Sequence, residues 1–314
     1  MHIRRIVTKK IINRICRYTI LILLSYQLLY PILYIISMSI RSPADAYDPS
    51  IIWIPKKLSI IGFIDAFKAM KYLSALKTSI ILGVGSAIFD VGSCALAGYG
   101  FARYKFPGKN ILFACVIFTL IVPAQTIILP SYLNMKYFDM GGLLKIVSKV
   151  LGTPPSLNLI GSYWSFFLPS LFGAGIRSGL FIYIFRQFFE SMSSSLEEAA
   201  YVDGSGPFRT FIHIMLPNAK NAIISVFLFS FVWHFNDYYL AKQFLGATKR
   251  TLIVALSSLR VDLSSYIGGQ TEFDPLRILT RMQAGCLLAI IPLFVLFLIT
   301  QKYFTDSIEH MGIK

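Results

Sequence analysis

One polar stretch interrupts the apolar sequence in the second half of this chain: Ser195-Leu-Glu-Glu-Ala-Ala-Tyr-Val-Asp-Gly-Ser-Gly-Pro-Phe-Arg209, continued by Thr210-Phe-Ile-His-Ile-Met-Leu-Pro217. Serines at 193–195 and glutamates at 197 and 198 are typical of a helix start, where free N–H groups and the helix dipole favour oxygen acceptors and negative charge. Glycines at 204 and 206 and the proline at 207 end that helix. Apolar residues at three- and four-residue spacing then predict a second short helix from about 208 to 216.

The spacing within this stretch resembles the EAA loop of permease subunits of bacterial ATP-binding-cassette importers. The matching positions are Glu198-Ala199-Ala200, Gly204, Ile214, Leu216 and Pro217. A surface helical hairpin without a special role is the alternative interpretation. Three further segments are similar to the maltose-type carbohydrate importer permeases, and the likeness runs from about Tyr18 to the end: Phe181-Ile-Tyr-Ile-Phe-Arg-Gln-Phe-Phe189, Phe231-Val-Trp-His-Phe-Asn-Asp237 and Gln301-Lys-Tyr-Phe304.

The resemblance implies the type I importer permease fold, with six transmembrane helices and a cytoplasmic coupling helix. It also implies import of a sugar, with an oligosaccharide expected, through a pathway of which this chain forms half. In such permeases the alanine-rich helix inserts into a groove of the ATPase, and closure of the ATPases moves the spans. The residues expected to couple to the ATPase are Glu197, Glu198, Ala199, Ala200, Asp203, Gly204, Gly206, Leu216 and Pro217.

Composition independently indicates an all-α membrane protein with several spans. The 314 residues are 55% hydrophobic and 14% charged, and the mean hydropathy is +0.64, values too apolar for an ordinary soluble domain. The net charge of +15 has no basic stripe typical of nucleic-acid binding, so lipid headgroups are the expected partner. The four cysteines lie singly, without the spacing of a disulfide framework or metal site.

Six apolar runs are long enough to cross a bilayer, and they lie at about 18–40, 76–102, 111–133, 162–189, 219–240 and 283–304. The first is preceded by a basic segment but has no small-residue cleavage site, so we expect a retained span and no removed signal peptide. The expected organisation is a basic tail at 1–17, the first span and outer loop at 18–75, a core domain at 76–304 with its coupling loop at 190–217, and a tail at 305–314.

Basic residues favour cytoplasmic termini. Six Lys or Arg lie in the first seventeen residues, and three more crowd the short turn at 103–109, as the positive-inside rule expects. This orientation predicts a multi-pass protein of the bacterial cytoplasmic membrane with the 195–217 stretch inside the cell. The outer loops are predicted to hold an amphipathic helix at 60–73, an insertion at 136–161 that is longer than the family pattern, and short helices at 241–282.

Polar residues inside the apolar runs are candidates for the solute pathway, because burying a charge in lipid costs about 2.5–3.5 kcal/mol unless it faces protein or water. They could donate or accept hydrogen bonds to sugar hydroxyls, while aromatic rings stack on sugar faces. Asp90 and Arg177 have an alternative role, since they can bond to backbone or to each other between helices. His234 and Asp237 lie near the predicted outer end of the fifth run. The residues expected to line the pathway are Asp90, Arg177, Tyr183, Trp233, Asn236 and Asp237.

The chain has no Gly-x-x-x-x-Gly-Lys-Ser/Thr phosphate-binding loop, so the ATPase is expected to be a separate polypeptide that binds ATP and magnesium. The resemblance implies a second, different permease subunit, two ATPase subunits and an extracytoplasmic solute-binding lipoprotein. This chain itself is predicted to be no enzyme and to hold no cofactor or metal.

Three other functions were considered from the sequence. The same loop would serve an importer of a non-sugar solute. A membrane enzyme acting on lipid-linked sugars would need a carboxylate pair or a metal cluster facing the membrane, which the lone Asp90 and four scattered histidines do not offer. A secondary transporter would show two related halves, and no internal repeat is evident.

Overall fold

A computed structural model describes residues 2–142, 146, 149, 156–267 and 275–312 of the chain. In these ranges every regular element is helical, and the β-structure consists of two isolated bridges, Arg41 with Leu58 and Phe138 with Leu157. The described chain divides into two compact units, Met1–Lys71 with Leu256–Pro292 (unit 1) and Tyr72–Ala255 with Leu293–Lys314 (unit 2).

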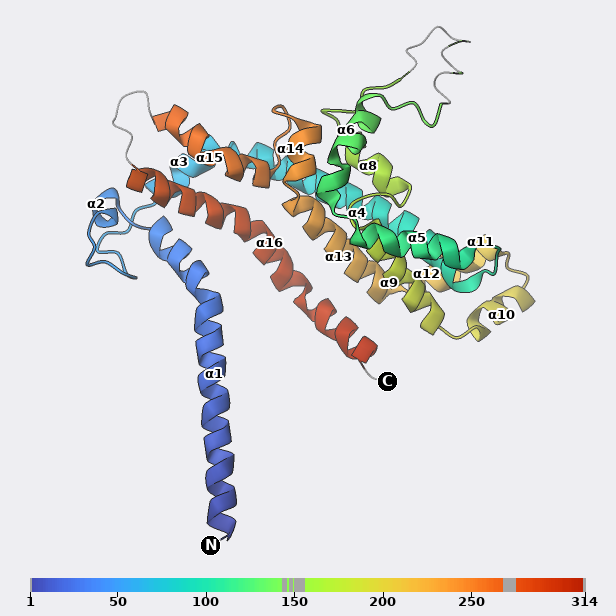
Figure 1. The fold of residues 1–314 in the computed structure, drawn as a ribbon, viewed down its shortest axis with the longest axis horizontal. Helices are drawn as coiled ribbons and strands as arrows, with labels where there is room; N and C mark the ends of the chain where they lie inside the picture. Colours follow the sequence, from blue (N-terminus) through green and yellow to red (C-terminus); the bar gives the residue numbers. More distant parts are fainter. Residues whose placement is uncertain (1, 143–145, 147–148, 150–155, 268–274, 313–314) are drawn as a thin grey trace. The chain divides into compact units, whose positions relative to one another are not determined.

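The helices follow one another along the whole described chain (Figure 1). The α-helices are α1 (His2–Ser39), α2 (Pro43–Ala46), α3 (Ile61–Ala69), α4 (Tyr72–Arg103), α5 (Lys109–Ile121), α6 (Ile128–Lys136), α8 (Trp164–Leu171), α9 (Ser178–Ser191), α10 (Ser195–Val202), α11 (Pro207–Thr210), α12 (Leu216–Asn218), α13 (Lys220–Asn236), α14 (Tyr239–Leu245), α15 (Leu252–Ile267) and α16 (Pro275–Gly312). A 3-10 helix, η1 (Ala124–Ile127), and a π-helix, η2 (Phe211–Met215), complete the set.

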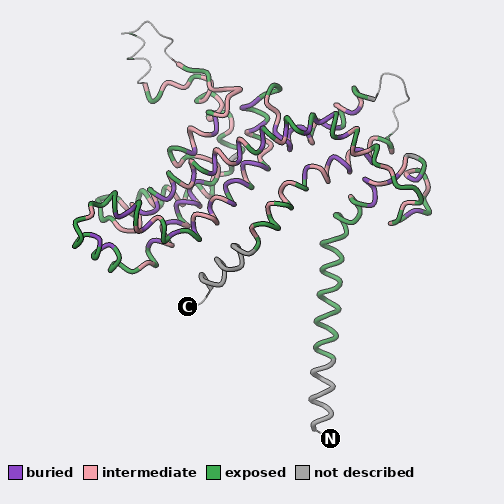
Figure 2. Tube along the Cα trace, turned by 180° about the vertical axis from the view of Figure 1, so that it is seen from behind, coloured by how far each residue is buried: buried purple, intermediate pink, exposed green. Residues whose placement is uncertain are grey.

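Unit 1 holds α1 to α3 with parts of α15 and α16. From Ile12 onward most of α1 is exposed (Figure 2), and the side chains along it are largely apolar. A helix that is apolar all round is typical of a membrane span. Inside the unit, the Nε of Arg281 on α16 lies 2.7 Å from the Oδ2 of Asp65 on α3.

The loop between α2 and α3 carries a surface ion pair. The Nζ of Lys56 lies 2.6 Å from the Oδ2 of Asp48, and hydrogen bonds from Lys56 and Ser50 hold the pKa of the Asp48 carboxyl well below its usual range. A helix forms within the segment predicted at 60–73, but it is shorter: α3 spans Ile61–Ala69, and Tyr72 already begins α4.

Unit 2 is built on α4, which packs against both α9 and α13 (Figure 1). Close approach explains the glycine at position 98, because a Cβ there would lie 2.6 Å from the Cβ of Phe185 and 2.9 Å from the backbone nitrogen of Arg186. Buried side chains of α4, α9, η2 and α13 form one apolar cluster, which includes Phe181, Phe185 and Met215. Figure 1 shows α10 and α11 at one end of unit 2 and α6 and α14 towards the other.

The apolar runs do not all become single long helices. Within the described residues three helical stretches are long and apolar enough to cross a membrane, Ile12–Ser39, Tyr72–Arg103 and Pro275–Gln301. Two further pairs qualify only as bent spans, Lys109–Ile121 with Gln125–Lys136 at 99° and Pro207–Asn218 with Lys220–Asn236 at 79°. The exact count of six predicted spans is therefore not confirmed by helix length and composition.

The predicted run 162–189 differs most from expectation, because it forms two helices, α8 and α9, and not one. The connection contains Gly173 with φ +65° and Arg177 with φ +61°. These left-handed conformations cannot continue a right-handed helix.

Two loop predictions have different outcomes. The segment predicted as an outer loop at 241–282 contains the end of α14, the sixteen-residue α15 and the start of α16, so it is more helical than the short helices expected. The amphipathic part of the 136–161 insertion lies mostly outside the described residues.

Candidate functional site

The 195–218 segment forms the predicted helix, break and second helix at one end of unit 2. Gly204 ends α10 with φ +76°, and its N–H donates to the carbonyl of Tyr201 at 3.0 Å while the next N–H, of Ser205, donates to Ala200 at 2.9 Å. This left-handed cap favours glycine. Gly206 differs, because its φ of −73° is open to any residue and it accepts the first bond of α11. Asp203, between them, is an exposed C-cap residue of α10.

Glu197 fastens this segment to the end of α4. The hydroxyl of Tyr99 donates to Oε1 of Glu197 at 2.6 Å, and the Nε of Arg103 lies 2.9 Å from Oε2. Arg103 also donates to the carbonyl of Met192, which precedes α10, at 2.9 Å. The Glu197 and Arg103 side chains are only 10% and 16% exposed, so water screens this pair weakly.

The two residues that follow Glu197 in α10 lie on the exposed side of the helix. Ala200 is buried, whereas Glu198 and Ala199 are exposed, and Glu198 has no ion-pair partner among the described residues. Large apolar side chains are exposed in the same segment, where a soluble surface would carry polar groups: Leu196, Tyr201, Val202, Phe208 and Ile212. The segment is therefore held from inside and presents an unpaired carboxylate and apolar side chains outside.

A π turn links this segment to α13. The N–H of Leu216 bonds to the carbonyl of Phe211, five residues earlier, directly before Pro217, which has no N–H to donate. Phe211 and Met215 are buried in the apolar cluster, and Leu216 packs against it. The chain then bends by 79° into α13, so α11 to α12 lead directly into a helix of the unit 2 core.

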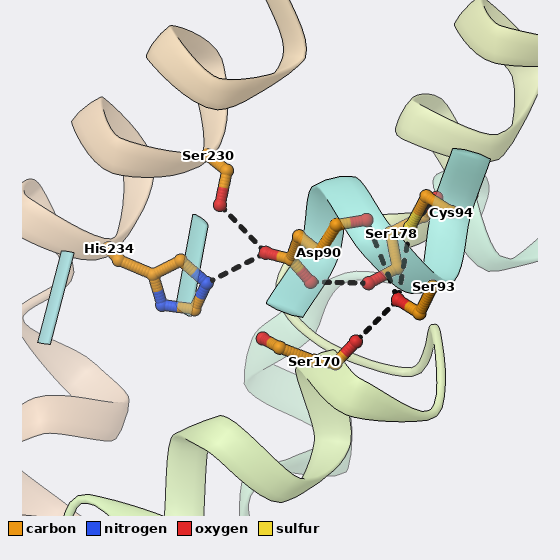
Figure 3. A network of polar contacts seen from close by, with 7 residues as sticks. All are labelled: Asp90, Ser93, Cys94, Ser170, Ser178, Ser230 and His234. Carbon is orange, nitrogen blue, oxygen red and sulfur yellow. Dashed lines mark hydrogen bonds and ion pairs between the residues drawn. The ribbon is translucent and has the colours of Figure 1, made fainter. Parts of the chain in front are cut away.

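Asp90 lies at the centre of a buried polar network between three helices (Figure 3). Ser178 of α9 donates to Oδ1 at 3.2 Å and Ser230 of α13 donates to Oδ2 at 2.7 Å. The Nε2 of His234, one turn after Ser230, lies 3.2 Å from Oδ2. Asp90 therefore bonds to side chains of α9 and α13 and not to Arg177, and it joins the helices of the core.

A cavity of about 520 Å³ lies in unit 2, with walls drawn from 119–138, 165–179 and 234–244. Of the residues predicted for the solute pathway, Arg177 and Asp237 line it. Asp237 also accepts the N–H of Ala241 at 2.9 Å through Oδ2, which caps α14. His234 lines the cavity too, and its buried Nδ1 has no hydrogen-bond partner in the described chain.

The other predicted pathway residues lie outside the cavity lining. Trp233 supports Arg177, whose guanidinium carbon lies 5.7 Å from the ring centroid. Tyr183 stacks on Phe113 at 6.5 Å, and the amide of Asn236 donates to the carbonyl of Val232 in its own helix.

Sequence reasoning missed several residues of both sites. Tyr99 and Arg103 lie about a hundred residues before Glu197, and Ser178 lies 88 residues after Asp90. The sequence offered one local signal for the network around Asp90: Ser230 and His234 are four residues apart, so they lie on the same face of a helix. Their common partner on α4 is a tertiary contact.

Known proteins resemble this chain over most of its length. Residues 94–310 match the family described as "Binding-protein-dependent transport system inner membrane component". The maltodextrin transport system permease protein MdxG of Bacillus subtilis is 28% identical over 311 residues, which cover 98% of each chain. The arabinooligosaccharides transport system permease protein AraQ of the same species is 28% identical over 262 residues, 83% of this chain and 80% of that one.

A solved structure shares the fold. This chain resembles one chain of a crystal structure of a bacterial ABC transporter involved in the import of the acidic polysaccharide alginate, with a TM-score of 0.73, 24% identity and coverage of 93% of this chain and 96% of that chain. The matched family region contains the 195–218 segment, α9 and α13. The chain therefore belongs to the family of inner membrane components of binding-protein-dependent transport systems, the permease subunits of ABC importers.

Proposed function

We propose that this chain is the permease subunit of an ATP-driven sugar importer, that an oligosaccharide is its solute, and that the 195–218 segment receives the ATPase. The observation that carries the coupling role is the two-sided character of that segment. Glu197 ties it to α4 with bonds of 2.6 and 2.9 Å, while Glu198, Val202 and Phe208 are exposed. An exposed apolar surface with a free charge, carried on a fixed base, suits a protein interface.

The sugar assignment rests on the relatives and on the cavity. MdxG and AraQ are named for maltodextrins and arabinooligosaccharides. The cavity combines aromatic walls, including Phe166 and Phe244, with polar groups such as Ser131 and Asn134. Pockets for small solutes commonly have this mixture of apolar walls and a few polar groups. A non-sugar solute and a membrane enzyme are less well supported, because neither accounts for both observations.

An ABC importer permease works with a partner permease, an ATPase and a binding protein. For this chain we propose a second, different permease, two ATPase subunits that bind ATP and magnesium, and an extracytoplasmic binding lipoprotein. We also propose that both termini lie in the cytoplasm of a bacterial cell, an orientation supported by the basic residues of the N-terminal tail and of the turn at 103–109.

The proposed coupling uses two connections. Glu198 contacts a basic group of the ATPase, and Gly204 fixes how α10 turns towards α11. Movement of the segment reaches α4 through Glu197 and Arg103, and it reaches α13 through Leu216 and Pro217. Rigid elements that move together convert closure of the ATPases into a change at the solute pathway.

The test is purification of the tagged chain from its native membrane, with identification of every retained polypeptide, beside the variants Glu198→Lys and Val202→Asp. We expect the wild type to retain a second permease and an ATPase, and both variants to lose the ATPase while they keep the second permease. Reconstituted wild-type transporter should then accumulate labelled maltooligosaccharides or other oligosaccharides when ATP and the binding protein are present.

Lys220→Gln is the matched control, because Lys220 is an exposed charge at the start of α13 and outside the proposed interface. It should retain all partners. An ATPase that stays bound in both variants would refute the docking role of the segment. Accumulation of amino acids or ions, with no oligosaccharide accumulated, would refute the sugar assignment.

A further inference from the structure

The cavity of unit 2 is lined by the guanidinium of Arg177, which forms no ion pair with a carboxylate in the described part of the chain. We propose that it binds an acidic sugar unit, a uronic-acid residue of the transported oligosaccharide, and that Arg177 binds the carboxylate. The inference rests on the proposed sugar importer function and adds the charge class of the solute. The cavity volume, about 520 Å³, falls within the usual range of small-molecule sites, about 300–1,000 Å³.

Arg177 lines this cavity without an acidic partner. In the described part of the chain no carboxylate lies within ion-pair distance of its guanidinium. The guanidinium carbon lies over the ring of Trp233, 5.7 Å from the ring centroid. A cation over an aromatic face is held in place while its N–H donors stay free. A guanidinium forms two parallel hydrogen bonds with a carboxylate, which a neutral hydroxyl cannot reproduce.

The backbone around Arg177 supports the same assignment. Arg177 has φ +61° and directly precedes the fourteen-residue α9. Strained left-handed residues persist where the surrounding structure imposes them, and they gather at ligand sites. Ser178 and Gly179, in the first turn of α9, also line the cavity, so the partial positive charge of the helix start adds to that of the guanidinium.

The acidic groups near the cavity already have partners. Both oxygens of Asp90 are bonded, one to Ser178 and the other to Ser230 and His234. Asp237 lines the cavity, but its Oδ2 accepts a backbone N–H of α14. Neither carboxylate pairs with Arg177, so its guanidinium is available to a carboxylate of the solute.

His234 provides a second, independent sign of a ligand. His234 is 1% exposed, and its Nε2 lies 3.2 Å from Oδ2 of Asp90. The residue lines the cavity, but its Nδ1 has no hydrogen-bond partner among the described atoms. A buried polar atom of this kind costs stability unless something bonds to it. With its proton on Nε2, the ring leaves Nδ1 as a buried acceptor beside the cavity.

The experiment compares two trisaccharides that differ only in charge, trigalacturonate and the galactotriose made by reducing its carboxyl groups. Their binding to the complete transporter in nanodiscs is measured by calorimetry without the binding protein, whose own specificity would otherwise contribute. We expect the acid to bind about 10- to 100-fold more tightly than the neutral sugar, as expected for a charge-assisted pair. Arg177→Gln should abolish that difference, and Arg177→Lys should retain part of it.

Lys136→Gln is the matched control, since it removes the same charge from a residue that follows Asn134 and Met135 but does not itself line the cavity. It should leave the difference unchanged, and all variants should retain the partner subunits on gel filtration. Equal binding of the two sugars, binding of neither, or an unchanged preference in Arg177→Gln would each overturn the inference. ATP-driven uptake of neutral oligosaccharides alone would overturn it and leave the proposed importer function intact.

Discussion

Replacing Glu197 by glutamine removes the charge that holds the 195–218 segment to α4 but preserves the shape of the side chain. The change breaks the ion pair with Arg103 at 2.9 Å and weakens the bond from Tyr99 at 2.6 Å. A hydrogen bond to a charged group contributes about 1.5–3 kcal/mol. Arg103 keeps its bond to the carbonyl of Met192 and is 16% exposed, so some of the lost interaction is replaced by water. We expect the free energy of unfolding to fall by about 2 kcal/mol.

The assay has two parts, because the ion pair is expected to contribute to stability and is proposed to contribute to coupling. Unfolding of the purified transporter in mixed micelles measures the first, and the ratio of solute transported to ATP hydrolysed in proteoliposomes measures the second. A double-mutant cycle with Arg103→Met should give a coupling energy of about 1–2 kcal/mol between the two residues. The transport ratio should fall in Glu197→Gln because α10 can then move without moving α4.

Glu198→Gln is the matched control for stability, because Glu198 is the next residue and is exposed. Its free energy of unfolding should stay within about 0.5 kcal/mol of the wild type, while its affinity for the ATPase falls. A coupling energy near zero, or equal stability losses in Glu197→Gln and Glu198→Gln, would refute the assignment of Glu197 as the inward contact.

Three further substitutions test the packing of unit 2 by the same unfolding measurement. Asp90→Asn should lower stability by about 2–3 kcal/mol, because the bonds to its charged carboxylate are lost, whereas Ser86→Ala, one turn earlier in α4 and without a partner for its buried hydroxyl, should be neutral. Gly204→Ala should lower stability by about 1–2 kcal/mol because its φ is +76°, whereas Gly206→Ala should not. Gly98→Val should lower stability by about 1–3 kcal/mol, because its side chain would overlap α9.

Each of these predictions has a contradicting result. Equal effects of Asp90→Asn and Ser86→Ala would show that the polar network contributes nothing to stability. Equal effects of the two substitutions at 204 and 206 would exclude a role for the left-handed cap. Gly92→Ala is the control for position 98, since no atom lies within 4 Å of a Cβ placed there, and a larger loss at 92 than at 98 would contradict the close approach of α4 and α9.

Local chemistry explains the features that sequence reasoning predicted correctly. Glycine at 204 and proline at 207 act on their own backbone, so the helix, break and helix of the 195–218 segment are visible without a partner. Hydropathy is likewise a local property, and it indicates a membrane protein from composition alone. The interruption between α8 and α9 was missed because 162–189 is mostly apolar and long enough for one span, and apolarity does not distinguish one long helix from two short ones.

For the candidate site too, the sequence predicted some features and the packing of the helices decided others. The sequence named Glu197 and Glu198 together as coupling residues, but neighbouring residues differ by about 100° around a helix, and only packing against α4 decides which one turns inward. Arg177 and Asp237 were named separately, and the fold brings both to one cavity. The sequence by itself determined the membrane class, the family and the helix, break and helix of the segment proposed for coupling, because these depend on residues near one another in the chain. Only the tertiary structure decided that Asp90 bonds to Ser178 and Ser230, 88 and 140 residues away, because such contacts depend on how three helices pack in space.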